Sequence, residues 1–363
     1  MTAPFAMLAL VTDAFGGRGG IAQYNRDFLT SLAQRGMAPS ITVLPRNAPD
    51  RSATPQGIRQ LPPQPGRTSY ILAALRTALT RRVDVVFCGH MYMAPLALLI
   101  ARLKRAKLVV QMHGIEAWPR PTPLRRAAVE AADLVLCVSR HTRAQVLAWA
   151  AIAPERVSVL PNTVGEAFSP GDGSSLRAAW GLQGKYVLLS VGRMDARERY
   201  KGHDRVITAI ARLVAEGHDV VYVVVGEGDD LPRLEALAEQ TGVADRVRFM
   251  GAVGRETLID AYRMADLFVM PSTGEGFGIA FLEAMASGSP ALGLAVAGAC
   301  DALADGELGT AVAESELVST LVRLLAQPKP NSDALATAVR GRFGYAPFAA
   351  GAGAALDRLM QAV

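Results

Sequence analysis

The chain has 363 residues, half of them hydrophobic, which is enough for one very large domain or two ordinary ones with sizeable cores. Its net charge of +5 is unevenly divided, because residues 1–165 hold 20 Lys and Arg against 8 Asp and Glu, and the remainder holds 18 against 25. The basic half should attract nucleic acid, phosphorylated metabolites or an anionic membrane leaflet. No hydrophobic run approaches the roughly 18 residues of a membrane-spanning helix, and three widely spaced cysteines suit a reduced cytosolic protein.

The first half of the sequence alternates between apolar runs and helical patterns. The N-terminal run reads as a buried strand rather than a signal peptide. The Pro- and Arg-rich residues 47–68 read as a loop. Strands are expected at residues 5–13, 40–46, 82–90, 107–114, 132–139 and 156–164, and the first is followed by a helix at 20–36.

A glycine-rich turn follows the first expected strand. Gly16, Gly17, Gly19 and Gly20 precede the helix, and such a turn allows backbone N–H groups to approach a phosphate at the helix N-terminus. The spacing is not the dinucleotide-binding G-x-G-x-x-G fingerprint. A flexible strand-to-helix turn is the alternative interpretation.

Residues 166–175 are polar and glycine-rich, which is typical of a linker, and the strand–helix pattern then begins again. Strands are expected at residues 185–193, 219–228, 246–251, 266–272 and 289–295, with helices at 257–265, 278–288 and 315–326. Continuous Val- and Leu-rich strands separated by helices indicate parallel sheets covered on both faces. The sequence therefore predicts an α/β protein with two doubly wound, Rossmann-like domains and a ligand cleft between them.

Two cations flank the start of the second domain's first helix. Arg193 ends the strand SVGR, and Lys201 precedes Gly202 at the helix start. Cations at these two places can hold a diphosphate from two sides and balance charge on a phosphate leaving group. The intervening Arg197, Glu198 and Arg199 read instead as a solvated charge run.

The stretch EGFGIAFLEAMASGSP contains Glu275 and Glu283 in an E-x7-E pattern. Together with GRMDARERYKG, GGRGGIAQY and QMHGIEAW, it resembles the retaining nucleotide-sugar glycosyltransferases of glycosyltransferase family 4, and especially members that act in bacterial polysaccharide assembly. The resemblance spans nearly the whole chain and implies the GT-B fold. It implies that Glu275 binds donor-sugar hydroxyls, that Glu283 binds ribose hydroxyls, and that His113 contacts the sugar near the reacting carbon.

The spacing of the two glutamates is physically consistent with these roles. A helix that begins near Phe277 or Gly278 would leave Glu275 in the preceding loop and place Glu283 one to two turns inside. A carboxylate can accept hydrogen bonds from two vicinal hydroxyls. The N–H groups of the first helical turn suit a diphosphate.

The candidate site residues fall into three groups. The expected catalytic residues are His113, Arg193, Lys201 and Glu275. Donor binding is expected to use Arg193, Lys201 and Glu275 again, together with Gly17, Gly276, Phe277, Gly278, Ile279 and Glu283. The expected acceptor-side residues are Gly19, Tyr24 and Arg140.

The resemblance implies that domain 1–165, joined by a C-terminal helix at about 345–363 that crosses back to it, binds the acceptor. Domain 166–344 would bind the donor. The sequence has no Asp-x-Asp motif and no cluster with metal-ligand spacing, so neither a metal nor a cofactor is predicted. The expected reaction is retaining, metal-independent transfer of a hexose from a UDP- or GDP-sugar to a glycan hydroxyl, as in exopolysaccharide or cell-envelope glycan synthesis.

The basic first half suggests an anionic partner for that domain. The run RLKRAK directly follows the apolar APLALLI, as in a helix that lies on a membrane surface. We therefore expect a cytoplasmic protein in peripheral contact with the inner leaflet, and a lipid-pyrophosphate-linked glycan as acceptor. A solvated basic surface over an apolar core helix is the alternative.

Other functions remain open at this point. A nucleotide-sugar epimerase or a sugar phosphorylase could share the fold, and so could a non-catalytic two-lobed protein that binds sugars or sugar nucleotides. Nucleic-acid binding would require aromatic residues interleaved with the basic ones. Aromatic residues make up only 6% of the chain and form no such stripe, so no nucleic-acid partner is predicted.

Overall fold

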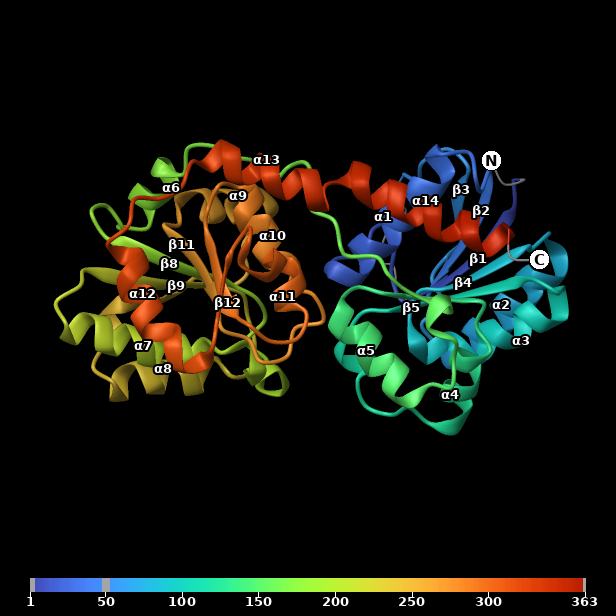
Figure 1. Cartoon of the computed structure of the whole chain (residues 1–363), viewed down its shortest axis with the longest axis horizontal. Helices are drawn as coiled ribbons and strands as arrows, with labels where there is room; N and C mark the ends of the chain where they lie inside the picture. The colour runs from blue at the N-terminus through green and yellow to red at the C-terminus, as the bar shows by residue number, and fades with distance from the viewer. Residues whose placement is uncertain (1–3, 48–52, 362–363) are drawn as a thin grey trace. The chain divides into compact units, whose positions relative to one another are not determined.

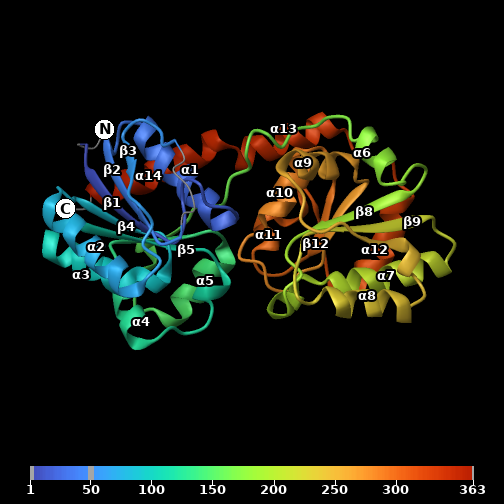
Figure 2. The ribbon, with the colours of Figure 1, turned by 180° about the vertical axis from the view of Figure 1, so that it is seen from behind.

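The computed structural model describes residues 4–47 and 53–361 of the chain. The described residues form two compact units, one made of residues up to Thr163 together with those from Tyr345 onward, the other of Val164–Gly344. Each unit contains one parallel β-sheet with helices on both faces (Figures 1 and 2). This confirms the predicted α/β fold with two Rossmann-like domains.

The N-terminal unit has the strand order β3-β2-β1-β4-β5-β6-β7. Its strands are β1 Ala6–Val11, β2 Ser40–Pro45, β3 Ile58–Gln60, β4 Val85–Cys88, β5 Lys107–Met112, β6 Leu134–Cys137 and β7 Val157–Val159. Its helices are α1 Gly20–Gln34, α2 Arg67–Thr80, α3 Ala94–Lys104, α4 Pro123–Glu130, α5 Arg140–Trp149 and α14 Tyr345–Gln361. The C-terminal helix α14 packs against α1, where the Tyr345 hydroxyl donates a hydrogen bond to Gln34 Oε1 (2.8 Å).

The C-terminal unit has the strand order β10-β9-β8-β11-β12-β13. Its strands are β8 Tyr186–Val191, β9 Val220–Val225, β10 Val247–Phe249, β11 Leu267–Met270, β12 Ala291–Leu294 and β13 Thr310–Val312. Its helices are α6 Ser174–Ala179, α7 His203–Ala215, α8 Leu231–Gln240, α9 Arg255–Met264, α10 Ile279–Ala286, α11 Ala299–Ala302, α12 Leu317–Leu325 and α13 Ser332–Phe343.

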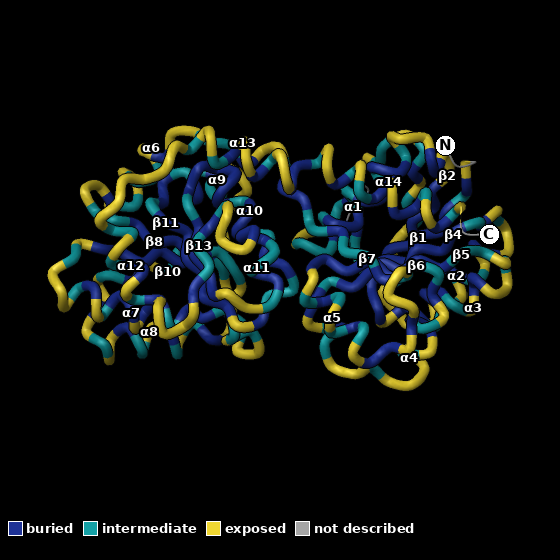
Figure 3. Tube along the Cα trace, in the orientation of Figure 1, coloured by how far each residue is buried: buried dark blue, intermediate teal, exposed yellow. Residues whose placement is uncertain are grey.

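The core of each unit follows from its apolar strands. All six residues of β9, with the sequence VVYVVV, are buried, as expected of a central strand covered on both faces. Helix α7 places Val206, Ile210 and Leu213 against the sheet at helical spacing. Buried positions accordingly follow the strands of both units, whereas exposed positions gather in loops and on outer helix faces (Figure 3).

Two details differ from the sequence-based prediction. The segment predicted as a loop, residues 47–68, contains the short strand β3, and α2 already begins at Arg67. Residues 48–52 of that segment lie outside the described residues. The last strand of the C-terminal sheet, β13, was not predicted, because Val312 is its one large apolar residue and no alternation is visible.

Candidate active site

The strand order of the C-terminal unit brings two of the candidate motifs together. Strand β8 lies between β9 and β11, so the chain continues from β8 to β9 on one side and returns from β10 to β11 on the other. In parallel sheets the crevice for a ligand lies at such a point, beyond the carboxyl ends of the strands. Arg193 and Lys201 follow β8, and Glu275 follows β11, so all three lie at this edge.

The two loops are in direct backbone contact. Thr273 donates its backbone N–H to the Tyr200 carbonyl (2.9 Å). Gly202 has φ +80°, and a Cβ at this position would lie 2.4 Å from the Pro271 carbonyl oxygen. Only glycine therefore fits between the loops, and the approach holds Lys201 beside the segment that carries Glu275.

Glu198 joins the two candidate cations. Its Oε1 accepts a hydrogen bond from Arg193 Nη2, and its Oε2 lies 2.9 Å from Lys201 Nζ. Only 14% of the Glu198 and Lys201 side chains is exposed, against 71% of Arg193. The prediction that Glu198 belongs to a solvated charge run was therefore wrong, because the loop turns its carboxylate inward.

Glu275 lies in the loop before α10, and its Oε1 is buried without a hydrogen-bond partner. Burial raises the pKa of this carboxyl, and the nearby Lys201 and a hydrogen bond with Ser272 oppose that rise. A buried acceptor without a partner costs free energy unless a ligand satisfies it. The Glu275 carboxylate is thus suited to accept a hydrogen bond from a ligand hydroxyl.

Helix α10 begins at Ile279, between the two glutamates, as the sequence predicted. Gly278 precedes it with φ +96°, a conformation that glycine adopts without strain. The first turn of a helix leaves N–H groups without partners inside the helix, and Gly276 lies in the loop just before α10. The Phe277 side chain is buried against Phe343, so only its backbone can face a ligand.

Glu283 lies in the second turn of α10 and accepts a hydrogen bond from the Tyr262 hydroxyl (2.8 Å). Burial raises its pKa to about 7, and the Tyr262 hydrogen bond and Arg255 limit the rise. The residue as a whole is half-buried, and its carboxylate oxygens can accept further hydrogen bonds from hydroxyl groups. Tyr262 was not predicted from the sequence, because it lies on α9, 21 residues away.

The loop after β9 supports the loop after β8. Met194 donates its N–H to the Glu227 carbonyl (2.8 Å), and Asp230 donates its own to the Met194 carbonyl (2.9 Å). A Cβ on Gly226 or Gly228 would lie 1.9 Å from a carbonyl oxygen of the β8 loop. Glycine at these positions lets the two backbones touch.

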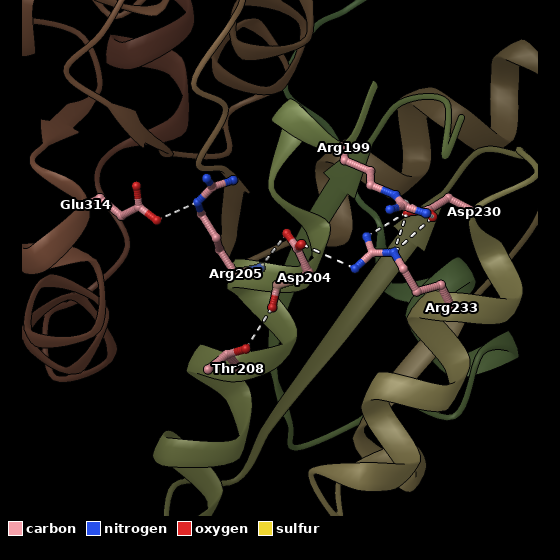
Figure 4. A network of polar contacts seen from close by, with 7 residues as sticks. All are labelled: Arg199, Asp204, Arg205, Thr208, Asp230, Arg233 and Glu314. Atoms are coloured by element: carbon pink, nitrogen blue, oxygen red, sulfur yellow. Dashed lines mark hydrogen bonds and ion pairs between the residues drawn. The ribbon is translucent and has the colours of Figure 1, made fainter. Parts of the chain in front are cut away.

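A network of ion pairs attaches the C-terminal part of the loop after β8, at Arg199, to its neighbours (Figure 4). Asp230 is 4% exposed, and its carboxylate accepts hydrogen bonds from Arg199 (2.8 Å) and Arg233 (2.6 Å). Arg233 also contacts Asp204 on α7 (3.3 Å). These hydrogen bonds lower the pKa of Asp230. The network attaches Arg199, two residues before Lys201, to α7 and α8.

In the N-terminal unit, the glycine-rich turn forms the N-terminus of α1. Gly19 precedes α1 with φ +87°, and nothing lies within 4 Å of where its Cβ would be. Gly17 packs against Asp13, and its carbonyl accepts a hydrogen bond from Arg26 Nη1 (2.8 Å). Both glycines therefore lie in the turn, Gly19 with open space beside it.

His113 follows β5 and is fixed from two sides. Its Nε2 lies 2.9 Å from the Gly89 carbonyl, which can only accept, so Nε2 carries the proton. Its backbone N–H donates to Glu116 Oε1 (2.6 Å). Burial lowers the His113 pKa to about 4, so the ring is neutral near pH 7.

Tyr24 and Arg140 occupy different surroundings. Tyr24 is 2% exposed, its ring packs edge-on against His113 at 5.4 Å, and its hydroxyl donates to the Leu160 carbonyl (3.4 Å). Almost none of the Tyr24 side chain is at the surface, so the predicted contact between this side chain and an acceptor is not made possible by the structure. Arg140 is exposed at the first position of α5.

Three residues of the site were not predicted in their roles: Glu198, Tyr262 and Asp230. Glu198 was interpreted as solvated, although it lies three residues before Lys201. Nothing in the sequence singles out the other two. Among the described residues, no group of three or more His, Cys, Asp and Glu side chains could hold a metal ion.

Two known family models match the chain. The family described as "Glycosyltransferase Family 4" matches residues 18–167, and "Glycosyl transferases group 1" matches residues 174–340. The chain is 32% identical over 268 residues to the GDP-mannose-dependent alpha-(1-6)-phosphatidylinositol monomannoside mannosyltransferase of Mycolicibacterium smegmatis, which covers 69% of both chains.

One further relative and one solved structure extend the comparison. The D-inositol 3-phosphate glycosyltransferase 1 of Catenulispora acidiphila is 33% identical over 253 residues, covering 63% of this chain and 60% of that protein. The fold matches Anabaena HepE, solved in complex with UDP and glucose, with a TM-score of 0.75 and 18% identity over 97% of this chain and 100% of HepE. The chain therefore belongs to the family 4 and group 1 glycosyltransferases and is a glycosyltransferase with the GT-B fold.

Proposed function

We propose that the chain transfers a hexose from a UDP- or GDP-sugar to a hydroxyl of a glycan acceptor, with retention of configuration and without a metal ion. The observation that carries this proposal is the buried, unpartnered Glu275 oxygen beside Lys201 at the carboxyl edge of the C-terminal sheet. At that place a carboxylate oxygen can accept a hydrogen bond from a ligand hydroxyl, and two cations lie beside it. A sugar joined to a diphosphate presents both complementary groups.

Each donor group has a proposed partner. Arg193, Lys201 and the N-terminal turn of α10 at Gly276, Gly278 and Ile279 hold the diphosphate. Glu275 accepts hydrogen bonds from sugar hydroxyls, and Glu283 accepts them from the ribose. His113 and Gly17 of the N-terminal unit are proposed to face the donor, and Gly19 and Arg140 the acceptor, as the family resemblance implies.

The cations are proposed to replace a metal ion. When the bond from the anomeric carbon to the phosphate breaks, negative charge develops on the leaving oxygen. Arg193, Lys201 and the helix N-terminus can stabilise that charge from fixed positions. The acceptor oxygen forms the new bond on the same face of the sugar, and a phosphate oxygen of the leaving group takes the acceptor proton. A trapped glycosyl–enzyme adduct would contradict this single-step mechanism.

A screen of nucleotides tests the donor site. The midpoint of thermal unfolding should rise with UDP or GDP but not with ADP or CDP, because a ligand that binds only the folded state stabilises it. The rise should be the same in magnesium and in EDTA. No shift with any nucleotide, or a shift only with magnesium, would contradict the donor site or its independence of metal.

Glu275→Ala tests the assignment of the sugar-binding residue. Turnover should fall about a hundredfold, the usual effect of removing one fixed transition-state partner. Nucleotide affinity should change little, because the diphosphate and ribose partners remain. Glu239→Gln, an exposed change on α8, serves as control. Normal turnover by Glu275→Ala would show that the assignment is wrong.

The acceptor is proposed to be lipid-linked and to be reached from the membrane surface. The M. smegmatis relative carries a phosphatidylinositol mannoside in its name, which favours a lipid acceptor. Exposed leucines and arginines alternate along one stripe of each of two adjacent helices: Leu72, Arg76 and Leu79 on α2, and Leu99, Arg102 and Leu103 on α3. Neither helix contains an acidic residue.

Such a face suits an anionic bilayer, where leucines enter the interface and arginines meet lipid phosphates. No helix among the described residues meets the length and hydropathy needed to cross a membrane. We therefore propose peripheral contact with the inner leaflet of a bacterial cytoplasmic membrane, in exopolysaccharide or cell-envelope glycan synthesis. Arg76→Ser with Arg102→Ser should reduce flotation with phosphatidylglycerol vesicles, and Arg212→Ser on α7 should not. Equal flotation with phosphatidylcholine vesicles would contradict the proposal.

A further inference from the structure

Glu198 is the one acidic side chain in contact with both proposed diphosphate-binding cations among the described residues. Its two carboxylate oxygens are divided between them, with Oε1 on Arg193 Nη2 and Oε2 on Lys201 Nζ (2.9 Å). A diphosphate would approach the same two cations with two or more negative charges. Glu198 and the donor phosphates therefore need the same partners.

The two contacts differ in how easily they can open. The Lys201 side chain is 14% exposed, so its pair with Glu198 is shielded from water and strengthened by the lower local dielectric. The Arg193 side chain is 71% exposed, and a pair that involves so exposed a group contributes little free energy. Arg193 can accordingly leave Glu198 at low cost, whereas Lys201 stays paired.

The loop keeps Glu198 in place while this happens. Asp195 accepts the Arg197 N–H (2.9 Å) and caps the short 3-10 helix η4, Ala196–Lys201, which carries Glu198. Arg199 is held by the buried Asp230 (2.8 Å), as Figure 4 shows. Since both neighbours of Glu198 are attached, the backbone that carries its carboxylate stays close to the two cations.

Glu275 shares the same electrostatic surroundings. The Glu198 charge adds to the burial that raises the pKa of Glu275, whereas Lys201 opposes it. Two carboxylates thus share one shielded ammonium group. An additional anion that approaches Lys201 is therefore repelled by the Glu198 carboxylate.

We propose that Glu198 is a built-in counter-ion that stays paired with Lys201, repels the donor diphosphate there and so weakens binding of the nucleoside diphosphate. This inference rests on the proposed donor site. The weaker binding serves the reaction because the nucleoside diphosphate is also the product. After transfer, Glu198 recovers Arg193 and helps to release the product, so the donor-free site keeps its cations paired.

The test compares nucleoside diphosphates with nucleosides. Isothermal titration measures binding of UDP, GDP, ADP and CDP, and of the matching nucleosides, to the wild-type chain, E198Q and E239Q. We expect E198Q to bind the preferred diphosphate about threefold to tenfold more tightly, as expected for removal of one near-surface charge. Its nucleoside affinity should stay unchanged, and E239Q should behave like wild type in both.

A second variant covers the case in which E198Q does not fold. The carboxylate of E198D is one methylene shorter and cannot reach both cations, so we expect tighter diphosphate binding by a smaller factor. Diphosphate binding that is unchanged or weaker in the folded variants would overturn the counter-ion role. Equal tightening for the nucleosides would overturn it too. If wild type binds none of the four diphosphates, the proposed donor site fails together with this inference.

Discussion

Gly228→Ala should displace the loop that carries Arg193. A Cβ at position 228 would lie 1.9 Å from the Met194 carbonyl oxygen and 2.0 Å from its carbon, whereas real Cβ atoms essentially never come closer than 3.0 Å. The opposing atoms are backbone, so no side chain can turn aside. The backbones must therefore separate by about 1 Å, the difference between these distances. The Met194–Glu227 and Asp230–Met194 hydrogen bonds would lengthen with them.

We expect a loss of about 1–3 kcal/mol in the free energy of unfolding, the usual cost of overpacking. Because a displacement of about 1 Å at an active site can cost about a hundredfold, turnover should fall much more than stability. Gly254→Ala is the matched control, since Gly254 has φ −66° and nothing lies within 4 Å of its Cβ position. Urea unfolding measures the loss of stability, and a sugar-transfer assay with a UDP- or GDP-sugar donor measures turnover. If Gly228→Ala matched Gly254→Ala in both assays, the backbone contact would not position Arg193.

Three further predictions concern individual residues. Burial raises the Glu283 pKa to about 7, so nucleotide affinity should increase as pH rises through 7 and the carboxylate ionises. The free energy of unfolding should fall as pH rises from the ordinary pKa of 4.5 to 7, because the folded chain then holds a proton that the unfolded chain has lost. Nucleotide titration and urea unfolding of Glu283→Gln should show neither trend. Asp230→Asn should lower the free energy of unfolding by about 1–2 kcal/mol at pH 7, a moderate loss because the arginine partners of Asp230 are partly exposed. The hydrogen bonds lower the Asp230 pKa, so the difference from wild type, measured by urea unfolding, should shrink as pH falls below 3.8. Gly278→Ala should lower the thermal midpoint, because a Cβ at φ +96° would lie 2.6 Å from the Phe281 ring; an unchanged midpoint would contradict the rigid start of α10.

The regular elements could be predicted because their signals are local. The apolar runs at β1, β8 and β9 are six residues long and almost entirely buried, so composition alone indicates central parallel strands. Strands β3 and β13 contain one large apolar residue each, Ile58 and Val312, so neither shows an alternating pattern. They lie at the edges of their sheets, where long-range pairing rather than local sequence defines the strand.

The individual contacts of the site could not be predicted in the same way. The motifs around Lys201 and Glu275 were visible as sequence patterns, and the strand order brings them to one edge. Whether a charged residue is solvated or paired depends on where a loop turns. Glu198 and Arg199 both looked exposed in the sequence, yet one joins Arg193 to Lys201 and the other contacts the buried Asp230.

Backbone contacts at glycines hold the loops of the proposed donor site together, so cations on these loops can act from fixed positions. Gly202 touches the backbone of the β11 loop, Gly228 touches that of the β8 loop, and a Cβ on Gly298 would lie 2.2 Å from the Gly276 carbonyl oxygen. Each contact leaves no room for a side chain, so neighbouring loops cannot move independently. Catalytic charge stabilisation requires groups that are already in place when charge develops. The glycines fix the backbone, the ion pair with Glu198 holds Lys201, and the exposed Arg193 is the cation that can leave Glu198 for the proposed donor.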